Sequence, residues 1–169
     1  MAVDQEERLA LANPDGIDAG SALRSECHKN RDLIHRAVHI MVEDGQGMLI
    51  LQKRSSKKQI QPGKWDTSVG GHVLAGESIR NAAIRELGEE LGITSTEPEP
   101  IYEYLWESPR EREYVSTFRL VWAGKVKAHP EEIDEVRAWS IREIEEAPIA
   151  MFTPNFLHEL NRYRIHRGL

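Results

Sequence analysis

The sequence predicts an α/β protein in which helices cover both faces of a mixed β-sheet, an α/β/α sandwich. Two observations support this prediction. Short apolar runs rich in β-branched residues, bounded by Gly, Pro, Asn or Asp, are typical of strands and occur in groups along the chain. Between and after these groups, apolar residues recur at helical spacing, most clearly in 77–91 and after Thr153-Pro154.

The first third of the chain is expected to form a hairpin or arm and then a second hairpin. Residues 1–30 are polar and contain the turn sequence Asn13-Pro14-Asp15-Gly16, which predicts a short hairpin or an arm. In 35–53, two apolar runs flank a Gly-containing turn at 44–47, the pattern of a β-hairpin. A basic loop, a short strand and a Gly-Gly pair are expected next, at 52–65, 66–69 and 70–71.

Residues 77–91 form the clearest predicted helix. Its apolar positions fall on one side at helical spacing, at Ala83, Ile84, Leu87 and Leu91. Gly92 follows directly and is a typical helix stop.

The remaining chain predicts strands and then helices. Two strands are expected at 101–106 and 114–123, joined by a charged loop at 107–113. A further strand, a short helix and a C-terminal helix follow, at 136–140, 141–146 and from Thr153-Pro154 onward. Proline suits the first turn of a helix, because its missing N–H would have no partner there.

Composition favours one globular domain, 1–169, in the cytoplasm. Apolar residues make up 40% and charged residues 30% of 169 residues, which is typical of a folded domain. The net charge of −6 disfavours nucleic acid as a partner. The single cysteine, Cys27, excludes an internal disulfide. No signal peptide is apparent, and no stretch approaches the roughly 18 apolar residues of a membrane span, so no membrane partner is expected.

The helix at 77–91 carries an unusual cluster of carboxylates. Glu86, Glu89 and Glu90 crowd one turn, and Glu86 and Glu90 repel each other at i,i+4 spacing. Gly88 weakens the helix further. A local sequence that opposes its own fold often marks a functional site. Clustered carboxylates suit Mg²⁺ or Mn²⁺, although for an acidic helix taken alone a solvated surface is the favoured interpretation.

The residues around this cluster indicate a specific motif. Gly71 is followed after five residues by Glu77, and after seven more by Arg85-Glu86-Leu87. Glu89-Glu90 and Gly92-Ile93 complete the pattern. The segment 71–93 resembles the Nudix box, with every fixed position filled. This resemblance implies the Nudix fold and a loop–helix–loop metal site.

By this resemblance, Glu86, Glu89, Glu90 and the Gly70 carbonyl hold Mg²⁺, and Arg85 and Glu77 brace the helix. The expected activity is hydrolysis of a diphosphate linkage in a small nucleoside-diphosphate-type metabolite. The metal would neutralise the diphosphate and lower the pKa of the attacking water. Glu89 and a carboxylate of loop 107–113 are both candidates for the general base.

A second resemblance extends outside the box. Segments 33–38, 51–55 and 62–72 are similar to isopentenyl-diphosphate isomerases and their close Nudix relatives. Those isomerases use a catalytic cysteine at the position of Gly70, and their Nudix helix is degraded. Here the cysteine is missing and the helix is intact. The sequence therefore favours hydrolysis, with an isomerase-like enzyme and a non-catalytic nucleotide-binding module as the alternatives.

The isomerases also hold a metal with three histidines and two glutamates. The matching positions here are His28, His35, His72, Glu111 and Glu113. Imidazole and carboxylate together suit Mn²⁺, Fe²⁺ or Zn²⁺, so these residues predict a second metal site. Isolated surface or core histidines are the competing interpretation.

Substrate recognition is less specific in the sequence. The basic loop before the box offers Arg54 and Lys64 as candidates for binding substrate phosphates. The group attached to the diphosphate is left open, and a homodimer is the expected assembly.

Overall fold

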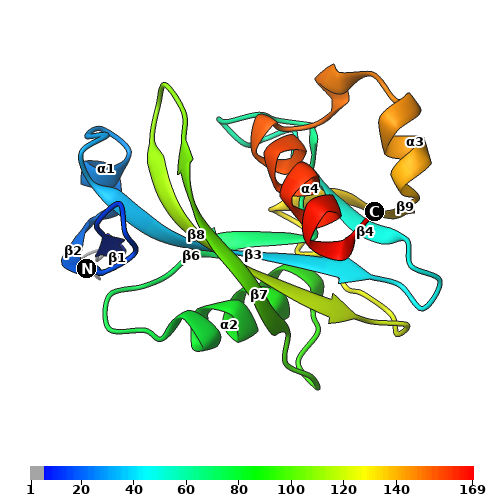
Figure 1. The fold of residues 1–169 in the computed structure, drawn as a ribbon, viewed down its shortest axis with the longest axis horizontal. Coiled ribbons are helices and arrows are strands. Elements are labelled where there is room, and N and C mark those ends of the chain that lie inside the picture. The colour runs from blue at the N-terminus through cyan, green and yellow to red at the C-terminus, as the bar shows by residue number, and fades with distance from the viewer. Residues whose placement is uncertain (1–5) are drawn as a thin grey trace.

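A mixed sheet of nine strands forms the centre of the protein in the computed structural model, which describes residues 6–169 (Figure 1). The strands are β1 (Arg8–Ala12), β2 (Asp18–Leu23), β3 (Ile34–Glu43), β4 (Leu49–Arg54), β5 (Trp65–Asp66), β6 (Val69–His72), β7 (Glu99–Glu107), β8 (Arg112–Val121) and β9 (Ile133–Trp139). The helices are α1 (Arg24–Cys27), α2 (Ile79–Leu91), α3 (Ile141–Glu146) and α4 (Pro154–Arg167), with a 3₁₀ turn η1 (Ile149–Met151).

Strand β3 organises the sheet. It runs parallel to β8 along its whole length, from Ile34↔Arg112 to Glu43↔Val121, and antiparallel to β1, β4 and β6. β7 joins antiparallel to β8, and β5 and β9 join antiparallel to β4. The predicted mixed sheet is therefore confirmed.

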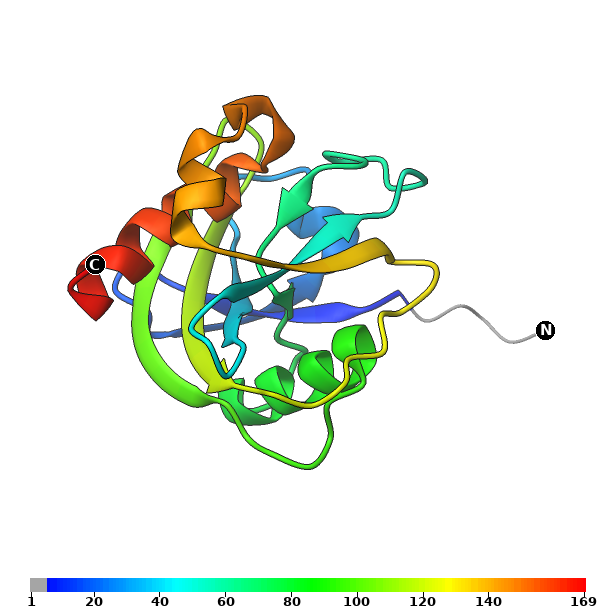
Figure 2. The ribbon, with the colours of Figure 1, turned by 90° about the vertical axis from the view of Figure 1, so that its right-hand side faces the viewer.

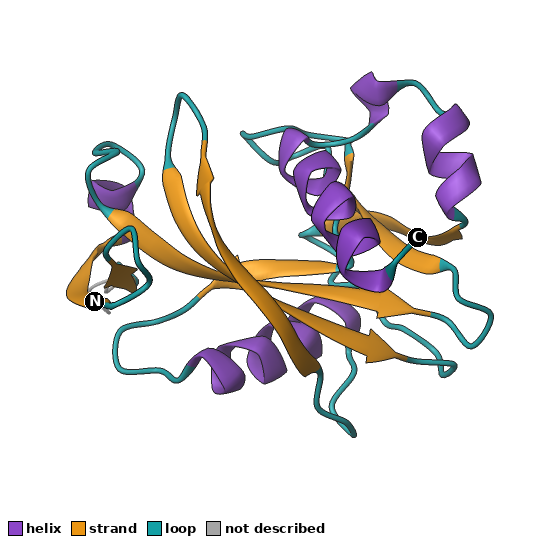
Figure 3. Cartoon of the chain, in the orientation of Figure 1, coloured by secondary structure: helices purple, strands orange, loops and turns teal. Residues whose placement is uncertain are grey.

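Helices lie on both faces of this sheet, as predicted (Figure 1, Figure 2). Val38 and Ile40 of β3 pack with Leu87 of α2 on one face. Met41 packs with Phe156 of α4 on the other face, since side chains alternate along a strand. Figure 3 shows α3 and α4 together on the side away from α2. Within the described residues, no helix combines the length and apolar character needed to cross a membrane.

The N-terminal segment forms a hairpin whose strand β1 extends the sheet beside β3. The turn is stabilised by Asn13, whose Oδ1 accepts hydrogen bonds from the backbone N–H groups of Asp15 and Ile17 at 2.9 Å each. The short helix α1 follows and ends at His28. The hairpin therefore carries His28 to the end of β3 where His35 lies.

Three predicted boundaries were wrong in instructive ways. The helix begins at Ile79, not at residue 77, because the Ser78 side chain caps it by accepting a hydrogen bond from the Asn81 N–H at 3.1 Å. The strand expected at 66–69 is two strands, and β6 continues through the glycine pair. Glycine has low strand propensity, but here the backbone pairs with β3 regardless. Glu113, expected in a loop, lies in β8.

A buried ion pair holds α4 on the sheet. Glu43 at the end of β3 is 6% exposed and accepts a hydrogen bond from Arg119 Nη2 at 2.7 Å and another from Tyr163 of α4. Glu43→Ala leaves Arg119 without this partner. We expect the free energy of unfolding to fall by roughly 2 to 3 kcal/mol, the low end for a broken buried pair, because Arg119 keeps some solvent contact.

Urea unfolding monitored by tryptophan fluorescence measures this loss. Arg142→Ala is the matched control, because it removes the exposed Arg142–Glu146 pair and should cost less than about 0.5 kcal/mol. Equal losses in the two variants would show that Glu43 does not fix the helix.

Candidate functional site

An arginine joins the glycine loop to helix α2. Arg85 donates to both carboxylate oxygens of Glu77, from Nε at 2.9 Å and from Nη2 at 3.0 Å. Arg85 Nη2 also donates to the His72 carbonyl at 2.9 Å, and Glu77 accepts from the Leu74 N–H at 3.0 Å. Two-pronged, charge-assisted hydrogen bonds are strong and directional. The Arg85–Glu77 pair therefore fixes the loop 73–78, which precedes the helix, against α2.

The same arginine touches the carboxylate cluster. Arg85 Nη1 lies 2.7 Å from Glu86 Oε1 and 3.4 Å from Glu89 Oε2. The Glu90 carboxylate has different partners: it accepts hydrogen bonds from Gln52 Nε2 at 2.7 Å and from the Gly70 N–H at 3.2 Å. The helix thus presents three carboxylates beside the backbone of β6, as the motif implies for a metal site.

Gly71 allows the Glu86 carboxylate to lie close to the backbone of β6. A Cβ atom built at Gly71 would overlap the Glu86 carboxylate, so no other residue fits without displacing it. At Gly70 a Cβ would meet its nearest neighbours, His39 and Thr67, at 3.5 Å, an ordinary contact. Of the two glycines, Gly71 is therefore the one that the position of the Glu86 carboxylate sterically requires.

The electrostatics of the cluster favour a cation. Burial and, to a smaller extent, the charge of Glu86 raise the pKa of Glu90 to about 8, although the hydrogen bonds from Gln52 and Gly70 oppose this. Burial also raises the pKa of Glu86, even though Arg85 opposes this. Like carboxylates held close together ionise with difficulty unless positive charge compensates them. Oxygen ligands of this kind fit Mg²⁺ or Mn²⁺.

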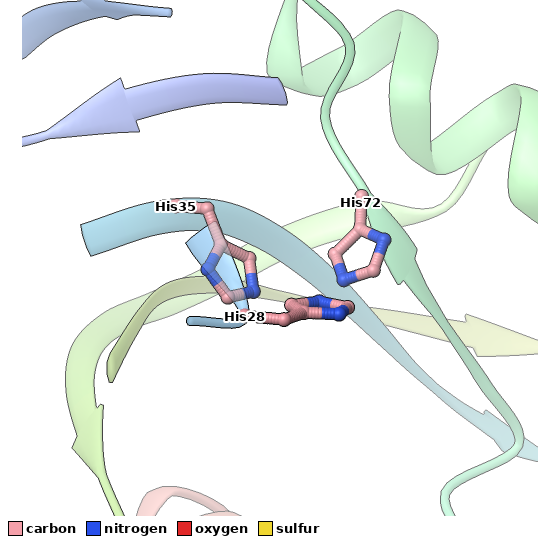
Figure 4. Close-up of side chains that lie close together, drawn as sticks. All are labelled: His28, His35 and His72. Carbon is pink, nitrogen blue, oxygen red and sulfur yellow. The ribbon is translucent and has the colours of Figure 1, made fainter. Parts of the chain in front are cut away.

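Three histidines meet at the other end of β6. His28 at the end of α1, His35 of β3 and His72 of β6 have ring centroids 5.1–5.6 Å apart. One ring nitrogen from each lies within 4.8 Å of the others. Figure 4 shows the three rings gathered around a common point. Burial lowers the pKa of His72 to about 3, so its imidazole is neutral, the form that binds metals.

Two glutamates from the β7–β8 hairpin complete this cluster. Glu113 Oε1 lies 3.1 Å from His35 Nε2, and Glu111 Oε2 lies 3.7 Å from His28 Nε2. Burial alone would raise the pKa of Glu113, but the hydrogen bond and charge of His35 lower it to about 2. The buried atoms His28 Nε2, His35 Nδ1 and Glu113 Oε2 make no hydrogen bond in the described structure. Unpaired buried polar atoms of this chemistry fit a transition metal ion.

Both clusters open into one cavity of about 720 Å³. The predicted residues along its wall are His28, Arg54, Gly70, His72, Arg85, Glu86, Glu89, Glu90, Glu111 and Glu113. Glu77 and His35 are not part of this wall: Glu77 pairs with Arg85, and His35 is the fully buried member of the histidine cluster. Lys64 is not part of the wall, whereas Lys58 from the same basic loop is. The structure therefore supports Lys58, not Lys64, as the lysine that faces the cavity.

Gln52 and His39 are among the cavity residues that were not singled out from the sequence. Gln52 holds Glu90, and His39 lies beside Gly70. Both strands carry other polar residues, such as Arg36 in β3 and Lys53 in β4, so no local pattern distinguishes Gln52 or His39 from a residue facing solvent.

Comparisons with known proteins agree with this geometry. The NUDIX domain model matches residues 33–160. An uncharacterized Nudix hydrolase of Pseudomonas aeruginosa is 33% identical over 96% of this chain and 96% of its own length. An isopentenyl-diphosphate Delta-isomerase of Escherichia coli is 36% identical over 58% of this chain and 54% of its own. A crystal structure of a Deinococcus radiodurans protein superposes with a TM-score of 0.78 at 26% identity, covering 93% of this chain and 98% of the other. The chain belongs to the Nudix hydrolase family, and isopentenyl-diphosphate isomerases are among its homologues.

Proposed function

We propose that this protein hydrolyses the diphosphate linkage of a small phosphorylated metabolite with Mg²⁺, or Mn²⁺ in its place. The observation that carries this proposal is the meeting of Glu86, Glu89 and Glu90 with the Gly70 backbone on one cavity wall. A cavity of about 720 Å³ has the size of a small-molecule site.

The chain's own residues have distinct tasks in this reaction. Glu86, Glu89, Glu90 and the Gly70 carbonyl would hold the divalent metal, which when bound neutralises the diphosphate and makes water a better nucleophile. Arg85 and Glu77 keep the helix and loop in register so that these ligands are already in place.

Positive side chains at the cavity wall suit substrate phosphates. Arg54 donates to the Ile60 carbonyl and lies 3.4 Å from Asp66, which holds its guanidinium in place. Lys58 pairs with Glu132 nearby. Arg54 is the better phosphate ligand, because a planar guanidinium can donate to two phosphoryl oxygens at once.

Two carboxylates are candidates for the base that takes the proton of the attacking water. The Glu89 side chain is 58% exposed, and Glu111 lies at the histidine cluster; both line the cavity. Glu89→Gln and Glu111→Gln are compared at saturating metal. Loss of the base lowers a turnover that added metal does not restore, whereas loss of a metal ligand also raises the metal concentration for half-maximal activity.

The isomerase alternative is disfavoured by the position of the cysteine. Cys27 is fully buried and packs with Leu9, Leu11 and Ala22, away from the cavity wall. Gly70 occupies the position at which the isomerases use their cysteine. The cavity wall of this chain thus has carboxylates for hydrolysis and no thiol for isomerisation.

Release of phosphate and monophosphate tests this proposal. Nucleotides, nucleotide sugars and prenyl diphosphates are incubated with the protein and Mg²⁺, with Glu90→Gln as the blank. Activity that disappears in the variant supports a hydrolase and identifies the substrate class. Silence across the panel, with conversion of isopentenyl diphosphate to its isomer, would establish the isomerase. Binding of nucleotide without any turnover would establish the binding module.

We further propose that His28, His35, His72, Glu111 and Glu113 bind a transition metal. His35→Ala removes the most buried of the imidazoles and is expected to abolish the bound metal. Metal analysis of protein purified without chelator measures the content of wild type and variant. His166→Ala, an exposed histidine at the end of α4, is the control and should keep the metal. Equal metal content in wild type and His35→Ala would contradict this assignment.

A further inference from the structure

A buried carboxylate outside both metal clusters has no part in the mechanism above. Glu159 on α4 is 0% exposed. Its oxygens accept hydrogen bonds from Tyr102 Oη, Tyr104 Oη, Thr117 Oγ1 and His39 Nδ1. These donors come from β7, β8 and β3, so one side chain of α4 gathers groups from three strands.

This carboxylate is ionised. Burial raises the pKa of Glu159, but the hydrogen bonds from His39 and the tyrosines outweigh burial and hold the pKa below its usual value. Removing an ionised carboxylate from water is unfavourable, and a tyrosine or apolar residue would fill the same space without that penalty. Buried ionised groups next to a cavity are candidates for functional roles.

Of the four donors, only His39 reaches the cavity. His39 lines its wall, whereas Tyr102, Tyr104 and Thr117 do not. His39 Nδ1 lies 2.8 Å from Glu159 Oε2, so Nδ1 carries the hydrogen that is donated to the carboxylate. The buried Glu159 carboxylate favours the imidazolium form of His39, because its hydrogen bond and charge raise the pKa of the ring against the effect of burial. The opposite ring nitrogen, Nε2, then also carries a hydrogen and is the one available to a ligand.

The position of Nε2 follows from the register of the sheet. His39 pairs with Gly70 of β6 on one side and with Thr117 of β8 on the other. A Cβ atom at Gly70 would lie 3.5 Å from His39 Cδ2 and 3.9 Å from His39 Nε2. Because Gly70 has no side chain, no Cβ atom covers this edge of the ring, and His39 and Glu90 both line the one cavity.

We propose that His39 is a substrate-contacting residue that donates from Nε2 to a phosphoryl oxygen of the bound diphosphate, and that Glu159 is the positioning residue that orients it. This inference rests on the proposed diphosphate hydrolysis. Glu159 plays the part of the third group that orients a histidine in many active sites, here presented by a helix on the far side of the sheet. The three remaining donors keep Glu159 fixed when the substrate leaves.

Steady-state kinetics of matched variants test the two roles. His39→Phe keeps the ring and removes both nitrogens, and we expect kcat/KM to fall roughly tenfold to a hundredfold, as for loss of one preorganised donor. Glu159→Gln should also lower kcat/KM, but by a smaller factor than His39→Phe. Tyr102→Phe is the control, because Glu159 keeps three donors, and its kcat/KM should stay within about twofold of wild type. The Mg²⁺ concentration for half-maximal activity should be unchanged in all three.

The double variant separates positioning from a structural role. If Glu159 acts through His39, then His39→Phe with Glu159→Gln should be no slower than His39→Phe alone. Additive losses would show that Glu159 does not act through the histidine. A folded His39→Phe variant with wild-type kcat/KM would overturn the contact itself, while leaving the proposed hydrolysis intact.

A measurement on the wild-type protein does not depend on how the variants fold. Methylenediphosphonate, a diphosphate that cannot be hydrolysed, is added with Mg²⁺ to protein labelled with ¹⁵N-histidine. We expect the His39 Nε2 resonance to shift on binding and the Nδ1 resonance to stay in place. Binding without a shift at Nε2 would overturn the inference. Wild-type protein that neither binds this probe nor releases phosphate from any substrate would instead overturn the proposed function.

Discussion

Glu90→Gln is expected to lower diphosphate hydrolysis roughly a hundredfold or more, the largest single effect predicted for this protein. Glu90 is the carboxylate held by Gln52 and the Gly70 N–H, so it is oriented before any metal binds. Glutamine keeps the size of the side chain and removes the anionic oxygen that a divalent cation needs. The Mg²⁺ concentration for half-maximal activity should rise together with the loss of turnover.

The same substitution should leave the fold intact. Glu90 carries a like charge beside Glu86, and burial disfavours its ionised form, so a neutral side chain relieves repulsion. Phosphate release and thermal unfolding are measured on the same preparation. Glu97→Gln, on an exposed carboxylate paired with Arg80, is the control and should change neither quantity. A folded Glu90→Gln protein with near-normal turnover would refute the metal assignment.

Gly71→Ala is expected to lower hydrolysis by a similar factor, roughly a hundredfold. The added methyl group would occupy the position of the Glu86 carboxylate, so Glu86 must turn away from the cavity or the β6 backbone must shift. Either movement displaces a metal ligand, and small displacements of catalytic groups have large effects on rate.

Gly70→Ala is the matched control for this prediction. Its methyl group would meet His39 and Thr67 at 3.5 Å, an ordinary contact, so the carboxylates need not move. We expect Gly70→Ala to retain at least about ten times the activity of Gly71→Ala. Phosphate release under identical conditions compares the two. Equal activities would show that the space at Gly71 is not what places Glu86.

Helices and motifs that are formed by residues close together in the chain could be predicted from the sequence. The periodicity of Ala83, Leu87 and Leu91 predicted α2, and these residues are buried in the core. The box 71–93 is one continuous segment, so its spacing alone predicts which side chains share a face. The mixed sheet between helices, predicted from the order of elements, is confirmed.

Boundaries near the glycines were harder, because backbone pairing overrode propensity there. β6 runs through Gly70 and Gly71 because their backbone groups pair with His39 and Val38 of β3. When a strand forms because its backbone pairs with a neighbouring strand, its own side chains do not predict it.

The sequence by itself determined the fold class, the family and the carboxylate helix, because each depends on residues close together in the chain. Only the tertiary structure brought His39 and Glu159 together, which lie 120 residues apart. It also decided that Lys58, not Lys64, faces the cavity. These contacts depend on the register of β3 with β6 and β8 and on the docking of α4. Strand register and helix docking are set by the whole core, so no local pattern encodes them.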